Sequence, residues 1–317
     1  MNRLADIAEP GTRIVVVGDR NDVGLFRDLI KLGVADYLVK PIAPAMLRRS
    51  LTFSNAVTEA RPAREGKVVA VIGARGGVGT STIAANIGWQ LAFGLSRRTA
   101  VVDLDVHNGS LNMMFDLKAN QGLAEALENP SALDPMGLER VVSMKGPRLF
   151  TLAAELPLKT SSPVTTKSVA ELSAALISQY HFIVYDCPWH SGDIVNLLVE
   201  RADFVVTIAD PGMVAVRNLA RIARLADPAH DTQRMMLVCN HIRPKSNESL
   251  TSGAMEAAFG RPIDHTLPHT PSLVRSQNLG RAQEAQPSSF SNVILDMVRD
   301  IGGGAATEQR EEHCSIW

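Results

Sequence analysis

A glycine-rich turn that joins an apolar run to an amphipathic segment is the part of this sequence best suited to chemistry. The apolar run Val68–Ile72 leads into Gly73-Ala-Arg-Gly-Gly-Val-Gly-Thr-Ser-Thr82, and apolar residues at helical spacing start from Ser81. The glycines let the backbone curl so that several N–H groups point inward, and the N-terminus of the following helix adds partial positive charge. A strand, such a turn and a helix in this order predict a cradle for phosphate groups.

Acidic residues follow two later apolar runs. Asp103 and Asp105 end the run that starts at Ala100, and Asp186 follows the run Phe182–Tyr185. Carboxylates suit Mg²⁺, which takes hard oxygen ligands and usually keeps several waters beside a bound phosphate. A single Asp after a strand is more often a turn or helix-cap residue, so these positions need the support of a wider pattern.

Strand and helix patterns alternate from Lys67 to about Gly302. The predicted strands are Val68–Ile72, Ala100–Leu104, Leu149–Leu152, Phe182–Tyr185, Phe204–Ala209, Met235–Cys239 and His265–Leu267. Helical patterns include Ser81–Phe93, Lys167–Gln179, Val214–Leu225 and Phe290–Ile301. This alternation predicts an α/β fold, a doubly wound and mostly parallel sheet with helices on both faces. Right-handed crossovers then bring the C-terminal ends of the strands, and any ligand, to one edge.

The N-terminal residues have a shorter pattern of the same kind. A strand over Arg13–Gly18, a helix over Val23–Leu32, a strand over Ala35–Val39 and a helix from about Ala43 to Thr58 are predicted. This is about half of a doubly wound domain, so we expect its sheet to be completed elsewhere or the domain to begin upstream. We predict a unit over residues 1–60, a polar linker over 61–66, a large domain over 67–302 and a disordered tail over 303–317.

Composition excludes several classes of protein. The 317 residues are 45% hydrophobic and 21% charged, as in a soluble globular chain of two domains. A balance of 32 basic against 33 acidic residues argues against binding nucleic acid through bulk positive charge. Cys187, Cys239 and Cys314 are too dispersed for a disulfide framework or a Cys-x-x-Cys metal site. No apolar run reaches the ~18–20 residues of a membrane span and no signal peptide is evident, so we expect a cytoplasmic protein.

The glycine-rich turn resembles the deviant phosphate loop of the ParA/MinD ATPase superfamily, Lys-Gly-Gly-x-Gly-Lys-(Thr/Ser)-Thr. The matching residues are Arg75, Gly76, Gly77, Val78, Gly79, Thr80, Ser81 and Thr82. Arg75 replaces the signature lysine, which in the family reaches the partner's nucleotide across a dimer interface. Thr80 replaces the phosphate-loop lysine, so nothing at that position neutralises the β- and γ-phosphates. The resemblance therefore implies a homodimer that binds ATP and Mg²⁺ weakly and hydrolyses ATP slowly or not at all.

The same resemblance assigns roles to residues on other strands. Asp103 would lie near the magnesium shell, Asp105 would orient the attacking water, and Asp186 would hold Mg²⁺ through water. Ser81 would be a further magnesium ligand, and Arg75 would hold phosphate. Two acidic sites, each after an expected strand and in the family's order, favour metal binding over the turn interpretation.

Two later positions resemble the family's base-binding segments. Asn240, at the end of Met235–Asn240, would contact the adenine edge, and Pro268 belongs to the loop that would wall the other side of the base. The resemblance thus makes residues 67–302 a ParA/MinD-like nucleotide-binding domain.

Further segments resemble the CpaE/TadZ proteins of the tight-adherence (Tad) pilus assembly system. They are Asp103–Gly109, Gly122–Pro130, Leu133–Asp134 and Arg148–Glu155. Those proteins carry an N-terminal receiver-like domain, and residues 12–50 resemble its second half. The phosphorylated Asp of true receivers ends an earlier strand that this chain does not contain, so phosphorelay signalling is not expected. The resemblance implies a factor that recruits Tad pilus proteins at the inner membrane or the cell pole.

Three functions stay open at this point. The first is a nucleotide-controlled positioning factor, the second a scaffold that needs no nucleotide, and the third a ParA-like DNA partitioning ATPase. The glycine run and the three acidic positions favour the first, while the net charge of −1 and the missing lysine weaken the third. No sequence-specific nucleic acid is expected. An iron–sulfur carrier of related fold would need clustered cysteines.

Three arginines share one face of the helix predicted after Asp210. Arg217, Arg221 and Arg224 fall at positions i, i+4 and i+7. A solvated helix face is the ordinary interpretation of such a pattern. The alternative is a docking stripe for an acidic partner, anionic lipid or DNA.

Overall fold

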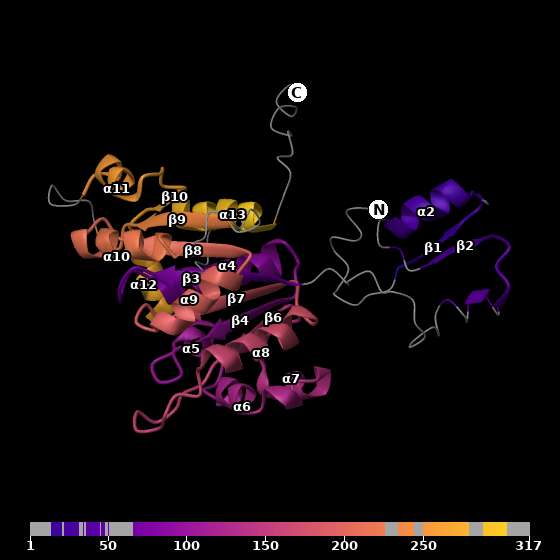
Figure 1. Ribbon diagram of the computed structural model, residues 1–317, viewed down its shortest axis with the longest axis horizontal. Coiled ribbons are helices and arrows are strands. Elements are labelled where there is room, and N and C mark those ends of the chain that lie inside the picture. Colours follow the sequence, from indigo (N-terminus) through magenta and orange to yellow (C-terminus); the bar gives the residue numbers. More distant parts are fainter. Residues whose placement is uncertain are drawn as a thin grey trace.

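A computed structural model describes residues 14–20, 22–31, 34, 36–44, 46–47, 50, 66–225, 234–243, 250–278 and 288–302 (Figure 1). Within these ranges the strands form one two-stranded and one eight-stranded sheet. Most of the helix expected over Ala43–Thr58, the linker residues 61–65 and the tail 303–317 lie outside the described residues. The domain boundaries therefore stay predictions.

The large sheet has the strand order β10-β9-β8-β3-β7-β4-β6-β5. The bounds are β3 Lys67–Gly73, β4 Thr99–Asp103, β5 Ser143–Lys145, β6 Leu149–Leu152, β7 Phe182–Cys187, β8 Phe204–Ala209, β9 Arg234–Asn240 and β10 His265–Leu267. Every adjacent pair is parallel except β5 with β6. The predicted fold class is confirmed, and each predicted strand is present within two residues of its expected bounds.

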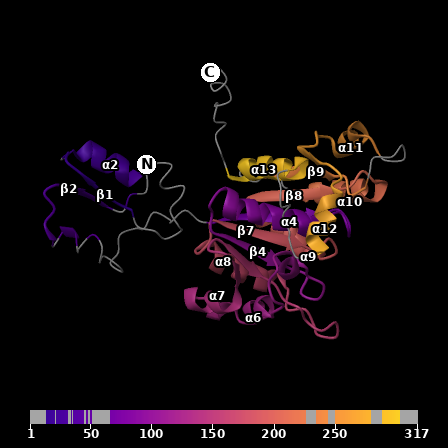
Figure 2. The same cartoon turned by 180° about the vertical axis from the view of Figure 1, so that it is seen from behind.

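Helices cover both faces of this sheet (Figures 1 and 2). One face carries α4 (Thr80–Trp89), its π-helical continuation Gln90–Gly94, α5 (Leu111–Met114), α12 (Pro271–Asn278) and α13 (Ser289–Gly302). The other face carries α6 (Gly122–Glu128), the short 3-10 turn Pro130–Ala132, α7 (Pro135–Val141), α8 (Thr166–Ile177), α9 (Gly192–Arg201), α10 (Met213–Ala223) and α11 (Ser252–Phe259). Among the described helices, none combines the length and apolar character that crossing a membrane requires.

The centre of the sheet is buried because helices cover both of its faces. Side chains of β3 alternate, so that Val69 and Val71 pack toward α4 and α13, whereas Ala70 and Ile72 pack toward α8 and α9. β3 lies between β7 and β8. β7 and β4 lie on one side of it, and β8 and β9, which come later in the chain, lie on the other side. The strand order thus reverses beside β3, where ligands bind in open α/β sheets.

The N-terminal unit is a small β-α-β element. β1 (Val15–Gly18) and β2 (Asp36–Val39) are parallel, and α2 (Val23–Lys31) connects them, as predicted. Leu29, Val34 and Tyr37 form its core, whereas Val17 and Phe26 stay exposed.

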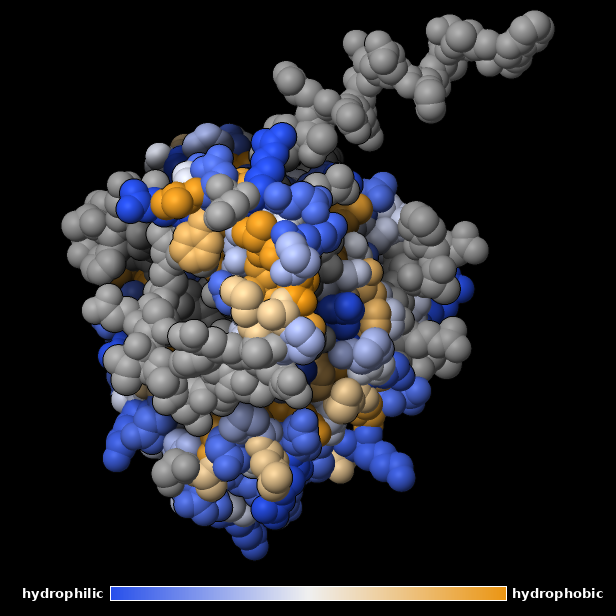
Figure 3. Space-filling model, turned by 90° about the vertical axis from the view of Figure 1, so that its right-hand side faces the viewer, coloured by the Kyte–Doolittle hydropathy of each residue, from blue (hydrophilic) through white to orange (hydrophobic). Residues whose placement is uncertain are grey.

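Figure 3 views the molecule from the right-hand side of Figure 1 and shows hydrophobic residues gathered near the centre of that face.

Candidate functional site

The predicted phosphate loop follows β3 at the centre of the sheet. Residues 74–79 form the turn, and α4 starts at Thr80. Gly77 and Gly79 have φ angles of 76° and 92°, which L side chains rarely adopt. A Cβ atom on Gly79 would also lie 2.6 Å from Nδ2 of Asn240. Both φ angles therefore favour glycine. Among the described residues, only the Arg75 side chain lies within 4 Å of a Cβ atom built at Gly77, so the space beside this backbone is open.

The first turn of α4 directs two hydroxyl side chains to different neighbours. Thr80 Oγ1 packs so closely on Gly73 that a Cβ atom there would overlap it. The Ser81 side chain forms a hydrogen bond with Asp186. Gly79, the N-cap residue, has no side chain to cap this end of α4, so the first N–H groups of the helix keep their capacity for an anion. Ser81 thereby joins the loop to the acidic residues of the neighbouring strand.

Asp103 and Asp186 are direct neighbours in the ladder between β4 and β7. Their exposed fractions are 1% and 5%. Burial raises the pKa of Asp103 to about 6, although the N–H groups of Leu111 and Asp105 donate to its carboxyl at 3.1 Å and 3.2 Å. Burial raises the pKa of Asp186 to about 8, and the charge of Asp103 adds to this effect. Two buried carboxyls this close to each other are a favourable location for a divalent cation.

Asp105 shapes the turn that follows β4. Its Oδ1 accepts hydrogen bonds from the backbone N–H groups of His107 at 3.3 Å and Asn108 at 3.0 Å. The carboxylate is half-buried at the same edge of the sheet, and its charge contributes to the raised pKa of Asp186. The structure therefore brings Asp105 near the pair of buried carboxyls, and its role toward water stays a prediction.

Arg75 is bound to a carboxylate of its own chain. Its Nε lies 3.0 Å from Asp210 Oδ1, and its Nη2 lies 2.6 Å from Asp210 Oδ2. The third guanidinium nitrogen, Nη1, donates to Gly76 O at 2.7 Å. Sequence reasoning missed Asp210 because it is 135 residues from Arg75, and only the pairing of β8 with β3 brings the two together.

Asn240 is also bound to the loop. Its Nδ2 donates to Val78 O at 2.8 Å, and the residue is buried. Leu267 is its partner in the ladder between β9 and β10, so Pro268 follows at the same edge of the sheet. The structure thus brings both predicted base-binding residues to this edge. The contact of Asn240 with adenine stays a prediction, since its amide nitrogen is used by the loop.

Trp189 is a second residue that sequence reasoning missed. A Cβ atom on Gly76 would lie 3.2 Å from its Nε1, and the side chain is 52% exposed. It comes three residues after Asp186, and a single Trp carries no spacing pattern that would have marked it in the sequence. The indole therefore lies against the phosphate loop.

The donors at this edge fit a polyphosphate with bound Mg²⁺. The open backbone at Gly77 offers room for phosphate, and Ser81, Asp103 and Asp186 offer oxygen ligands. In the described part of the chain, no three His, Cys, Asp or Glu side chains gather into a metal-binding group. Mg²⁺ commonly needs only one or two carboxylates when phosphate oxygens complete its shell.

Two of the three arginines lie on α10, and the third, Arg224, is its C-cap residue. Arg217, Arg221 and Arg224 are exposed, and none forms an ion pair with a described residue. Met213 and Val214, which start the helix, are 72% and 56% exposed. The predicted stripe is therefore present as a basic surface, and α10 begins three residues after Asp210.

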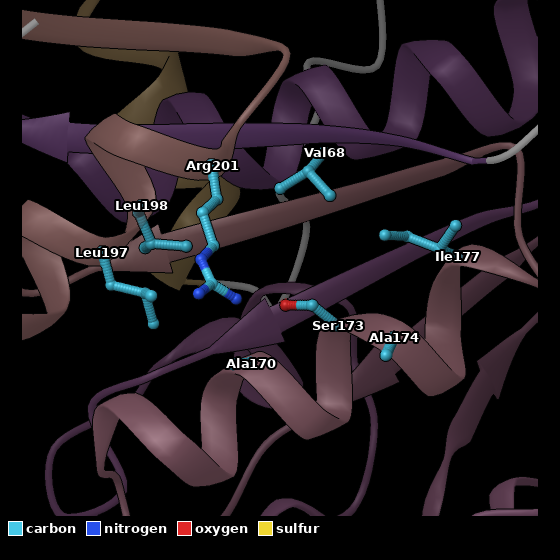
Figure 4. Close-up of a pocket in the computed structure, with 8 residues that line it drawn as sticks. All are labelled: Val68, Ala170, Ser173, Ala174, Ile177, Leu197, Leu198 and Arg201. Carbon is cyan, nitrogen blue, oxygen red and sulfur yellow. The ribbon is translucent and has the colours of Figure 1, made fainter.

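A cavity of about 370 Å³ lies apart from this edge, between α8 and α9 (Figure 4). Its lining includes Val68, Ser173, Leu198 and Arg201, and Figure 4 shows the Arg201 side chain pointing into it. Val68 lies near the start of β3, whereas the phosphate loop follows the end of the same strand. The cavity is therefore not part of the candidate site.

The chain is similar to a family model and to proteins of known fold. Residues 65–283 match the ParA family model, which is described as NUBPL iron-transfer P-loop NTPase. A putative septum site-determining protein MinD from Guillardia theta is 26% identical over 217 residues, which cover 68% of this chain and 79% of that protein.

Two solved structures show the same fold. A ParA family ATPase from Chlorobium tepidum TLS has a TM-score of 0.65 at 23% identity and covers 74% of this chain and 98% of its own. The septum site-determining protein MinD complexed with Mg-ADP from Pyrococcus horikoshii OT3 has a TM-score of 0.64 at 16% identity, covering 74% and 96%. With a family model that matches more than half of its length, the chain belongs to the ParA family of P-loop NTPases.

Proposed function

We propose that this chain is a ParA/MinD-type positioning factor that binds Mg²⁺ and ATP weakly, dimerises with ATP, and hydrolyses it slowly or not at all. The observation that carries the proposal is the phosphate loop with its open backbone at Gly77, joined through Ser81 to the buried carboxyl of Asp186. A scaffold that had lost its ligand would have no need to keep these features together.

In the proposed site, separate groups of residues would bind the phosphates, the metal ion and the attacking water. Backbone N–H groups of the loop and of the first turn of α4 would hold the phosphates. Ser81, Asp103 and Asp186 would hold Mg²⁺, partly through water, and the metal when bound would neutralise phosphate charge. The two buried carboxyls must first lose their protons, so higher pH favours metal binding. Asp105 would orient the attacking water.

Weak binding follows from the residue at position 80. A hydrogen bond to a charged group contributes ~1.5–3 kcal/mol, and Thr80 offers no charge in place of the family's lysine. Its hydroxyl also packs on Gly73. We infer a nucleotide affinity lower by about 10–100-fold than that of a loop with its lysine.

The narrower role that we propose is in Tad pilus assembly, as a CpaE/TadZ-type protein. The β-α-β order of the N-terminal unit supports this role, because it agrees with the second half of a receiver-like domain. The MinD relative from Guillardia theta is named as a septum site-determining protein, which suggests a related task of positioning at a membrane or cell pole. The exposed arginines of α10 are the proposed contact with an acidic partner or lipid.

Iron transfer, which the description of the family model mentions, has little support in the described residues. Cys187 and Cys239 are buried on β7 and β9, with exposed fractions of 1% and 2%. No metal-binding group of three includes them in the described ranges. A thiolate ligand has to be accessible and deprotonated, and burial raises the pKa of the Cys187 thiol.

The test is to titrate ATP or ADP with Mg²⁺ into the full chain and follow its mass by light scattering. The proposal predicts a rise from one chain to two with ATP, and no rise with ADP. A nucleotide-independent scaffold predicts the same mass with ATP, ADP or neither, which would refute the proposal. Retention on DNA at physiological salt would favour the partitioning ATPase instead.

A further inference from the structure

The Arg75–Asp210 ion pair connects the phosphate loop to the segment that leads into α10. All three guanidinium nitrogens are engaged, Nε and Nη2 by Asp210 and Nη1 by Gly76 O. The side chains of Arg75 and Asp210 are 32% and 14% exposed. Arg75 is therefore held within its own chain, although it stands where the family carries a lysine that reaches across a dimer.

The backbone on both sides of this pair is held in place. Ala74 N donates to Ile208 O at 2.7 Å, which links the start of the loop to β8. Asn218, from α10, donates through Nδ2 to Ala74 O at 3.0 Å. After β8 the chain turns at Asp210, whose O accepts a hydrogen bond from Gly212 N at 2.7 Å. These contacts preorganise the carboxylate to meet the guanidinium.

A carboxylate and a phosphate bind a guanidinium in the same way, through two parallel hydrogen bonds. Asp210 thus uses the donors that Arg75 would offer to a phosphate group. We propose that Asp210 is a positioning residue that competes, within the chain, with the terminal phosphate of a nucleoside triphosphate for Arg75. This inference rests on the proposed function, because it takes the loop to be a nucleotide site.

The competition determines which nucleotide benefits when the ion pair opens. Apparent affinity is the intrinsic affinity multiplied by the fraction of molecules in which Arg75 is released. Arg75 is withheld from the nucleotide for as long as both of its hydrogen bonds to Asp210 are formed. A triphosphate gains from the released guanidinium, whereas a diphosphate lacks the group that would take the place of the Asp210 carboxylate.

The experiment uses the full chain with Asp210→Asn, which removes the charge and keeps the shape. Calorimetric titration with Mg²⁺ and either ATP or ADP is expected to show ATP binding about tenfold tighter than in the wild type. ADP binding is expected to stay within about twofold, since the diphosphate makes no use of Arg75. Asp210→Ser carries the same expectation, should the Asn variant not fold.

Two further variants separate positioning from a merely structural role. Asp210→Glu restores the carboxylate, so the wild-type preference between ATP and ADP should return. Combining Arg75→Gln with Asp210→Asn should abolish the gain in ATP affinity, because the gain acts through the guanidinium.

The outcomes distinguish this inference from the proposed function. If folded Asp210→Asn binds ATP with the same affinity as the wild type, or more weakly, the role of Asp210 is overturned. The proposal of a nucleotide site is then unaffected. An equal gain for ATP and ADP would also overturn the role of Asp210, because the competitor would not be the terminal phosphate. If neither protein binds any nucleotide at millimolar concentration, both proposals fail.

Discussion

Thr80 and the two buried aspartates set the chemical limits of the site. Thr80 Oγ1 packs on Gly73 and brings no charge to the loop. Asp103 and Asp186 offer carboxyl oxygens, but burial makes both hold their protons to higher pH than ordinary aspartates do. The site therefore combines a neutral loop with two carboxyls whose ionisation a bound cation would favour.

Replacing Thr80 with Lys should tighten binding of ATP with Mg²⁺. The ammonium would add a charge-assisted contact to the β- and γ-phosphates, for which we expect a gain of about 10–100-fold in calorimetric titration. The matched control is Thr166→Lys, which adds the same charge at the first residue of α8. An affinity equal to that of the wild type in a folded Thr80→Lys protein would show that the pocket differs from a phosphate site beyond this residue.

Asp186→Asn should change how stability depends on pH. Because the pKa of Asp186 is raised from 3.8 to about 8, the folded state binds its proton more tightly than the unfolded chain does. The resulting stability is complete below pH ~4 and is lost as pH rises through about 8, by up to ~1.4 kcal/mol per pH unit. Thermal unfolding between pH 5 and 8.5 without nucleotide should fall less steeply in the variant. Parallel profiles would contradict the raised pKa.

The loop and its acidic neighbours could be located from residue types and their order along the chain. Asp210 and Trp189 could not. An Asp-Pro-Gly sequence after a strand has the pattern of an ordinary turn, and a lone Trp carries no spacing signal. Their contacts with Arg75 and Gly76 depend on which strands are neighbours in the sheet, and that order is not written in any local pattern.

At the scale of elements, parallel strands bring the site together. β4, β3 and β7 end at the same edge of the sheet, so residues far apart in the sequence meet there. Strong apolar runs made these strands predictable, and β8 has its predicted bounds, Phe204–Ala209. β5 was missed because three residues at the sheet edge, with no buried member, provide no apolar pattern.

Gly79→Ala tests how the loop enters α4. The substitution forces a side chain into a φ of 92° and against Asn240 Nδ2, so we expect a loss of about 2–3 kcal/mol in unfolding free energy. The control is Gly253→Ala in α11, where a Cβ atom would meet nothing within 4 Å, and a gain of up to ~1 kcal/mol is expected. Urea denaturation measures both. Similar values for the two variants would mean that the loop tolerates a side chain at position 79.

At the scale of the whole molecule, a nucleotide edge and a basic helix lie on one chain of nearly balanced charge. The net charge is −1, so attraction to an acidic surface must come from a local feature such as the α10 arginines. The Arg75–Asp210 contact and the hydrogen bond from Asn218 Nδ2 to Ala74 O link α10 and the segment before it to the loop.

Reversing the charges of Arg217, Arg221 and Arg224 to Glu should abolish recruitment while the fold is kept. The three side chains are exposed, so we expect each to change the unfolding free energy by less than about 0.5 kcal/mol. Fluorescence microscopy of a tagged chain would show the loss of localised signal. A control chain with Arg140, Lys159 and Lys167 reversed carries the same charge change on other exposed positions and should localise normally. Unchanged localisation of the α10 variant would assign recruitment to another surface.

Amide hydrogen exchange of the full chain, followed by mass spectrometry with and without saturating ATP and Mg²⁺, tests the central claim most directly. If main-chain N–H groups of the loop hold the triphosphate, exchange should slow at residues 76–82 and stay unchanged in α7 and α8. Exchange at residues 76–82 that is the same with and without millimolar nucleotide would contradict the account.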